Sequence, residues 1–187
     1  MKYVSSLLLS FFLAFSVQAI EVAGVQLKPS IKENSQSLTL NGAGIRSKFF
    51  MDLYVGSLYT TAKTKSVADV LDGKTTAAVR LDIISSLITS DNMVDSIEEG
   101  FHNATGGKIA PLQDRIKAFM KVFSKTEIKK GESFTLVGVP DVGVTAYRNG
   151  KEVIKISGDD FRKALFAIWL GDKPASKTLK KQMLGDK

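Results

Sequence analysis

Arg46 is the residue whose surroundings most clearly suggest chemistry. It follows the segment Asn41-Gly42-Ala43-Gly44-Ile45 and precedes the aromatic pair Phe49-Phe50. A guanidinium directed into apolar surroundings can bind a carboxylate through two parallel hydrogen bonds. The alternative is an arginine at a strand end that points into water. The residues therefore make Arg46 a candidate anion-binding group and leave its orientation open.

Two glycines, Gly42 and Gly44, lie two residues apart in the strand-like segment before Arg46. Glycine weakens a strand because it adds no side-chain packing, so a pair of them indicates a bend or a close approach of something to the backbone. No helix pattern follows directly, as a phosphate-binding glycine loop would require. We therefore expect a bend or a close contact here, and no nucleotide site.

Composition excludes several kinds of catalytic centre. The chain has no cysteine, which rules out disulfides, thiol catalysis and cysteine-ligated metals. His102 is its only histidine, and we interpret it as a surface or capping residue. Neither a nucleophile elbow nor a dinucleotide fingerprint is present. The sequence therefore predicts no metal and no cofactor.

The first nineteen residues have the pattern of a secretory signal peptide. A basic start at Lys2 precedes an apolar stretch over 7–17, and Val17-Gln18-Ala19 supplies a small-residue cleavage site. An uncleaved membrane anchor is the alternative, but the apolar stretch is shorter than the roughly 20 residues a span needs. We therefore expect a signal peptide over 1–19, one domain over 20–187 and a periplasmic or secreted location, with no stable membrane span after signal removal.

The chain is basic, with a formal net charge of +7. Lysines gather at 125–130 and again at 173–181, which indicates either solvated surface or attraction to an anionic partner. Nucleic acid is not an expected partner, because no recognition motif is present. The oligomeric state is left open.

Hydrophobic patterning predicts the elements that must position Arg46. Alternation in 75–84 places Ala77, Val79 and Leu81 on one face of a strand. Asn149-Gly150 is a strong signal for a two-residue hairpin turn, because both residues tolerate positive φ. Strands are expected at 25–27, 37–40, 45–59, 75–84, 134–139, 142–148 and 152–156.

Helical periodicity occupies the remaining segments. Helices are expected at 66–71, from Ser90 or Asp91 to about 103, at 111–123, from Asp159 or Asp160 to Gly171, and at 176–184. This order of strands, helices, a strand meander and further helices predicts an α+β fold, an antiparallel sheet covered by helices on one side.

Three segments together resemble the chalcone isomerase-like family, in particular its bacterial exported branch. They are Leu40-Asn41-Gly42-Ala43-Gly44-Ile45-Arg46, Tyr54-Val55-Gly56-Ser57-Leu58-Tyr59 and Ala167-Ile168-Trp169-Leu170-Gly171-Asp172-Lys173-Pro174. The resemblance implies an open-faced β-sandwich, in which a long antiparallel sheet carries helices on one face with a ligand cleft between them.

The resemblance also implies roles for single residues. Arg46 matches the arginine that holds the phenolate or ketone end of the flavonoid in plant chalcone isomerases, and that binds a carboxylate in fatty-acid-binding relatives. Tyr54 falls where the plant enzymes have a threonine. The positions of the plant polarising tyrosine, the lysine, the asparagine and a late threonine or serine carry Met93, Ser96, Gly100 and Ile168, so cyclisation by the plant route is not expected.

Three functions follow as hypotheses. The first is non-catalytic binding of a fatty acid or other lipophilic carboxylate by Arg46 and Tyr54. The second is an isomerase (intramolecular lyase) acting on a chalcone-like or other unsaturated phenolic substrate, with Arg46 stabilising an oxyanion and Tyr54 as the acid. The third is an envelope interaction protein that docks through its basic segment, residues 173–181.

Overall fold

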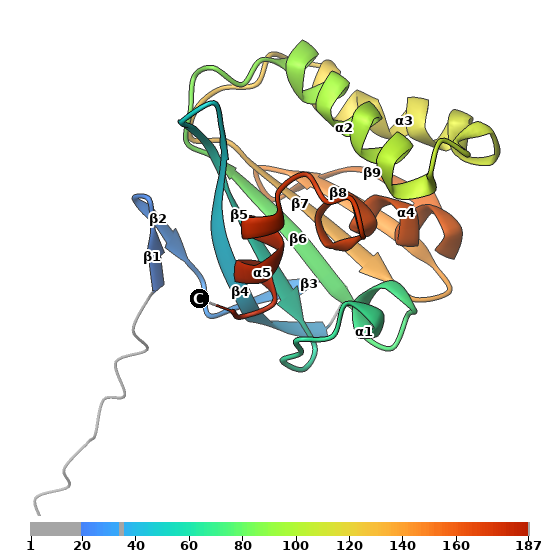
Figure 1. The fold of residues 1–187 in the computed structure, drawn as a ribbon, viewed down its shortest axis with the longest axis horizontal. Helices are drawn as coiled ribbons and strands as arrows, with labels where there is room; N and C mark the ends of the chain where they lie inside the picture. Colours follow the sequence, from blue (N-terminus) through green and yellow to red (C-terminus); the bar gives the residue numbers. More distant parts are fainter. Residues whose placement is uncertain (1–19, 34–35, 187) are drawn as a thin grey trace, which may run out of the picture.

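Seven strands form one antiparallel sheet that carries most of the helices on one face (Figure 1). The computed structural model describes residues 20–33 and 36–186. Each strand of the sheet pairs with its neighbours in sequence, and a separate hairpin of β1 and β2 precedes it. The strands are β1 (Ile20–Val22), β2 (Val25–Leu27), β3 (Ser30–Glu33), β4 (Gln36–Lys48), β5 (Met51–Thr60), β6 (Ala77–Ile83), β7 (Ser133–Val139), β8 (Gly143–Arg148) and β9 (Lys151–Ser157).

The helices lie close to the expected positions. They are α1 (Val67–Leu71), α2 (Ser90–Thr105), α3 (Gln113–Ser124), α4 (Asp159–Leu170) and α5 (Lys177–Met183), with a 3₁₀ turn at Ala110–Leu112. The α+β fold with an antiparallel sheet and helices on one face is therefore confirmed. Among the described residues, none of these helices has the length and apolar character needed to cross a membrane.

Two expected helix caps are wrong. Helix α2 is capped by Thr89 rather than by Ser90 or Asp91, because Thr89 and Asn92 form a reciprocal capping box. Helix α4 has Gly158 at its N-cap and no side-chain cap. Asp159 and Asp160 occupy its first turn instead, where their charges favour the helix dipole.

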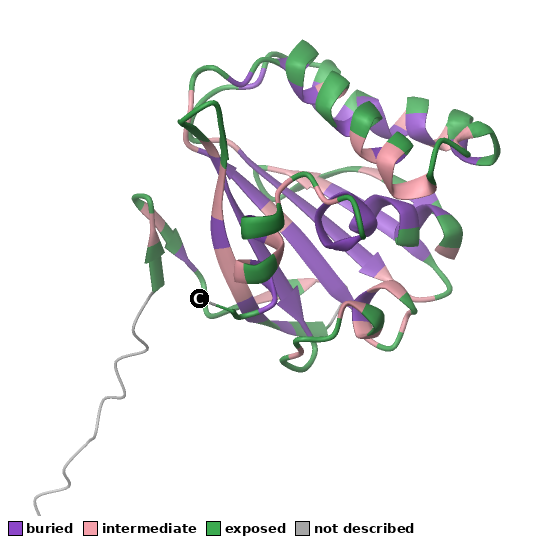
Figure 2. Ribbon diagram, viewed as in Figure 1, coloured by how far each residue is buried: buried purple, intermediate pink, exposed green. Residues whose placement is uncertain are grey.

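The main core lies between the sheet and the helices, where Figure 2 shows continuous burial. Side chains alternate along each strand, so Tyr54 and Leu58 face this core while Val55 and Tyr59 face the other side. A smaller cluster on that other face includes Leu27 from the N-terminal hairpin. The second face is therefore partly covered by the N-terminal hairpin.

The expected single strand over 45–59 is wrong, because a tight turn divides it. Lys48 pairs with Met51, and Phe49 and Phe50 form the two-residue tip of the β4–β5 hairpin. Both have positive φ, 50° and 64°. Such a turn normally uses Asn or Gly, so phenylalanine gave no turn signal.

The glycines of β4 are explained by helix α5, which packs directly on that strand. A Cβ at Gly42 would collide with the backbone oxygen of Gln182 and lie 2.7 Å from that of Met183, and one at Gly44 would collide with the Gln182 side chain. The expectation of a close approach at these glycines is therefore confirmed. The partner is a helix of the same chain.

We predict that Gly42→Ala destabilises the protein by about 1–3 kcal/mol, because a methyl group must displace the backbone of α5. Strand propensity alone predicts the opposite sign, since alanine is better than glycine in a strand. Chemical denaturation measures the difference. Thr39→Ala, at an exposed position of the same strand, is the control and should change stability little; a Gly42→Ala variant as stable as wild type would contradict the contact.

Glu132 connects three segments at the start of β7. Its carboxylate accepts hydrogen bonds from Arg148 at 2.7 Å and from Asn149 at 2.9 Å, and Arg148 also donates to the backbone oxygens of Thr126 and Glu127. The Arg148 hydrogen bond lowers the pKa of Glu132 from 4.5 to about 2, with smaller contributions from the Lys129 backbone and Asn149. This network stabilises the ionised carboxylate.

Glu132→Gln should lower the free energy of unfolding by about 2–3 kcal/mol at neutral pH. Because the folded-state pKa lies below the unfolded value, the stabilisation is complete above about pH 5 and is lost as the pH falls from 4.5 toward 2. Denaturation at several pH values should therefore show the variant and wild type converging in acid. Glu152→Gln, an exposed residue paired with Lys155, is the control and should show no such convergence.

Candidate functional site

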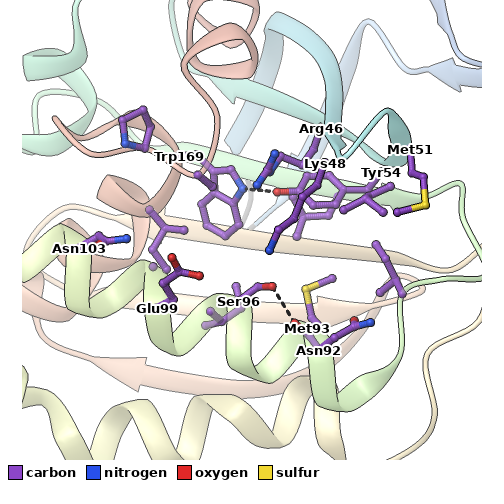
Figure 3. Close-up of a pocket in the computed structure, with 18 of the residues that line it drawn as sticks. Arg46, Lys48, Met51, Tyr54, Asn92, Met93, Ser96, Glu99, Asn103 and Trp169 are labelled. Atoms are coloured by element: carbon purple, nitrogen blue, oxygen red, sulfur yellow. Dashed lines mark hydrogen bonds between the residues drawn. The ribbon is translucent and has the colours of Figure 1, made fainter.

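A cavity of about 420 Å³ lies between the sheet and helix α2. This volume falls within the range of about 300–1,000 Å³ typical of small-molecule sites. Strands β4, β5 and β6 form one wall, α2 forms the facing wall, and the segment from the end of α4 to Ala175 closes a third side. Figure 3 shows Arg46, Lys48 and Tyr54 on the sheet side and Ser96, Glu99 and Asn103 on the helix side.

The structure brings Arg46 and Tyr54 together at this cavity, as the family resemblance implies. They are directly opposite each other in the β4–β5 ladder, and both line the cavity. Residues opposite each other in an antiparallel pair lie on the same face, with their Cβ atoms about 4.5–5.5 Å apart. Arg46 therefore lies on the cavity face of the strand with its side chain half-buried, and its role as an anion-binding residue stays a prediction.

Tyr54 is held in place by Trp169 of α4. The indole Nε1–H donates to the Tyr54 hydroxyl oxygen at 3.0 Å, and both side chains are buried (Figure 3). Burial raises the pKa of Tyr54 above its ordinary value, opposed by the Trp169 hydrogen bond and the nearby Arg46 charge. The phenol therefore stays protonated at neutral pH. Its own proton has no acceptor among the described residues, so it can be donated to a ligand.

Arg46 is half-buried and has donors left over for a ligand. Its hydrogen bond within the described chain goes to the backbone oxygen of Ser47, and no carboxylate of the described residues pairs with it. A guanidinium has five N–H donors, so most of them remain available. Lys48 and Lys173 also line the cavity, against one carboxylate, Glu99. The charged lining therefore favours an anionic ligand.

The rest of the cavity wall is largely apolar. In Figure 3, Met51 and Met93 lie toward one end of the cavity, while Trp169 and Asn103 lie toward the other. The apolar lining comes from Phe49, Met51, Leu53, Leu81, Leu87, Ile88, Met93, Ile97, Ile168, Trp169, Pro174 and Ala175. A ligand with a charged head and an apolar body matches this division.

The four positions matched to plant catalytic residues all lie on the cavity wall. Met93, Ser96 and Gly100 contribute from α2, and Ile168 contributes from α4. Gly100 also allows close packing, since a Cβ there would lie 2.7 Å from Ile168. None of these four side chains ionises near neutral pH. Their places in the cavity agree with the alignment that the resemblance implies.

Two residues of the cavity, Trp169 and Lys48, were not identified as functional from the sequence. Trp169 was expected only as part of the core stripe of its helix; it is buried there and also donates to Tyr54. Lys48 was not singled out, because its orientation depends on the unrecognised hairpin turn. A tryptophan in the middle of a resemblance motif was the one available signal.

The basic C-terminal segment is only partly free for a partner. Leu179 and Met183 of α5 are buried against the sheet, and Lys180 donates to the backbone oxygen of Gly171 at 2.9 Å. Lys177 and Lys181 remain exposed. Docking through this segment therefore stays a prediction.

An antiparallel sheet with helices on one face, and between them a cavity with cationic and apolar parts, defines an α+β domain with a cavity of the size typical of small-molecule sites. The family model described as chalcone isomerase-like matches residues 19–185. The chain therefore belongs to the chalcone isomerase-like family.

A solved structure supports the same fold. A fatty-acid binding protein of Arabidopsis thaliana superposes with a TM-score of 0.71 at 14% sequence identity, covering 89% of this chain and 96% of that one. A search among curated proteins gave no significant match.

Tyr54→Phe should destabilise the protein by about 1–3 kcal/mol, because it leaves the buried Trp169 N–H without an acceptor. The measurement is thermal or chemical unfolding followed by the emission of Trp169, the only tryptophan in the sequence. Tyr147→Phe, at a half-buried position on β8, is the control and should have little effect. Equal losses in the two variants would show that the Trp169 hydrogen bond contributes no specific stability.

Proposed function

We propose that this protein binds a fatty acid or other lipophilic carboxylate, with Arg46 as the anion-binding residue and Tyr54 as a hydroxyl donor. The observation that carries this proposal is the cross-strand pair at the cavity: a half-buried guanidinium without a carboxylate partner among the described residues, beside a hydroxyl whose proton is unused. The similarity in fold to the Arabidopsis fatty-acid binding protein supports the same class of ligand.

The energetics favour a ligand that is both charged and apolar. Hydrogen bonds to a charged group contribute about 1.5–3 kcal/mol each. Each methylene group buried against the apolar wall adds roughly 0.8 kcal/mol. A carboxylate with a hydrocarbon tail uses both contributions in one molecule, whereas a small inorganic anion uses only the first.

We also propose that the protein is exported and works in the periplasm or outside the cell. The support is the signal-peptide pattern over 1–19, which lies outside the described residues. In that setting a lipid-derived carboxylate is an available ligand, since the cell envelope contains acyl chains.

Isomerase chemistry is the second candidate, favoured by the same two polar groups. A protonated Tyr54 could serve as an acid, and Arg46 could stabilise a developing oxyanion. The four wall positions that carry Met93, Ser96, Gly100 and Ile168 offer no ionisable partner, so binding is the preferred function. Absorbance assays with a panel of chalcones separate the two: turnover that disappears in Tyr54→Phe would favour the enzyme.

Arg46→Ala should weaken fatty-acid binding about tenfold or more while leaving the affinity for the fatty alcohol of equal chain length unchanged. The reason is that the alcohol lacks the carboxylate that Arg46 binds but fills the same apolar space. Displacement of a fluorescent fatty acid gives both affinities, and native mass spectrometry gives occupancy.

Lys117→Ala is the matched control, since it removes a positive charge from an exposed position on α3 outside the cavity. It should leave both affinities at the wild-type values. Equal fatty-acid affinity in wild type and Arg46→Ala would disprove the anchoring role of Arg46.

A further inference from the structure

The apolar end of the cavity continues onto an exposed apolar tip. Phe49 and Phe50, at the turn of the β4–β5 hairpin, are 77% and 107% exposed, and Met51 and Leu87 beside the cavity are also exposed. These four residues, which we call the apolar rim, account for most of the large exposed hydrophobic side chains in the described chain. Such concentrated apolar exposure marks an interaction site.

The backbone geometry of this turn indicates that Phe49 and Phe50 have a role other than forming the turn. The β8–β9 hairpin has the same two-residue geometry, with positive φ at both positions, and builds it from Asn149 and Gly150. Asparagine and glycine tolerate positive φ, whereas bulky side chains do so at a cost in strain. Two exposed phenylalanines at positive φ stabilise neither the turn nor the protein's solubility.

Positive charges predominate around the apolar rim, as in surfaces that bind anions. Lys48 directly precedes Phe49, and its ammonium lies 5.6 Å from the centre of that ring. Arg46 and Lys173 line the same cavity, and the whole chain is strongly basic. Asp52 is the acidic residue within the hairpin, and it accepts a hydrogen bond from Ser47. Aromatic side chains beside lysine are typical of segments that rest in the interface of an anionic bilayer.

The size of the rim favours a bilayer over another protein. A stable protein interface covers about 800 Å² on each partner, whereas fully burying a phenylalanine removes only about 150–250 Å². A narrow hairpin tip with a few apolar side chains is small for a second copy of the chain, but it is sufficient for insertion between lipid headgroups.

We propose that the apolar rim inserts into the surface of an anionic lipid bilayer, so that the cavity opens toward the membrane from which its ligand comes. This inference rests on the proposed function in its choice of ligand, while the insertion itself does not require that a ligand be bound. The tail end of the cavity then faces the hydrocarbon, and Lys48 faces the lipid phosphates.

The test is flotation of the protein with phosphatidylglycerol vesicles and with phosphatidylcholine vesicles. The full chain is expressed in an exporting bacterium and the soluble form is purified. We expect wild type to float with the anionic vesicles and the Phe49→Asn/Phe50→Gly variant to bind them about tenfold or more weakly. Because that variant carries the turn residues of the β8–β9 hairpin, it should fold at least as stably as wild type.

Val142→Asn is the matched control, since Val142 is 64% exposed and lies at the opposite end of the sheet. It should float like wild type. Equal flotation of wild type and the hairpin variant, or no flotation of wild type, would overturn the proposal. So would size-exclusion chromatography with light scattering that shows a wild-type dimer lost in the hairpin variant, because the rim would then cover a second copy.

Fatty-acid affinity measured without vesicles distinguishes a failure of the membrane-insertion proposal from a failure of the fatty-acid-binding proposal. Phe50→Gly alone, which leaves the cavity-lining Phe49 in place, should bind fatty acid as wild type does, because it changes no residue that lines the cavity. Flotation that persists in Arg46→Ala while fatty-acid binding is lost would show that the two depend on different residues. Flotation with no fatty-acid binding in any variant would leave the rim supported and refute the proposed ligand.

Discussion

The close packing of helix α5 on strands β4 and β5 is the contact on which the site depends. Gly42, Gly44 and Gly56 leave no side chain between that helix and the sheet, so α5 lies directly on the backbone. The helix thereby fixes the loop that leads to it, in which the Ala175 N–H donates to the Ile168 oxygen at 2.8 Å. That loop is one wall of the cavity. Larger side chains at these three glycine positions would displace α5 and the loop that leads to it, and would widen the cavity.

The electrostatics of the site follow from how deeply each polar group is placed. Tyr54 is buried and hydrogen-bonded to Trp169, so burial keeps it protonated and its proton is available for donation. Arg46 is half-buried, so its guanidinium avoids the desolvation cost that full burial imposes. Elsewhere the chain buries an arginine completely: Arg162 donates to the backbone oxygens of Val70 and Leu71 and pairs with Asp159. That arginine is fully engaged within the fold, whereas Arg46 has donors to spare.

Sequence patterns predicted the fold class and most elements, because alternation and helical periodicity report burial directly. The family resemblance, rather than periodicity, drew attention to Arg46 and Tyr54, which the structure places opposite each other at the cavity. Sequence patterns failed at the β4–β5 turn, since phenylalanines at positive φ contradict turn chemistry and only the paired strands impose that geometry. They indicated a close approach at Gly42 but could not name the approaching element, because that contact joins residues about 140 positions apart. The Trp169–Tyr54 hydrogen bond was invisible for the same reason. Long-range contacts leave little trace in local patterns.

The choice between binding and catalysis for this protein has to be argued from its cavity walls rather than from its fold. A shared fold can host unrelated functions, so the argument has to come from the side chains at the site. Here the positions that the plant enzymes use for their polarising and positioning groups hold a thioether, a hydroxyl, a glycine and a branched alkyl group, all on the cavity surface. Such walls can exclude water and accommodate an alkyl chain, but they cannot transfer a proton at neutral pH. Glu99 of α2 and Tyr54 are the remaining lining groups that could exchange a proton, and the raised pKa of Tyr54 keeps it a protonated hydroxyl donor and makes it a weak acid. Three cations against one carboxylate, a fixed hydroxyl donor and a largely apolar remainder of the wall are therefore the features that support the proposal of carboxylate binding over conversion.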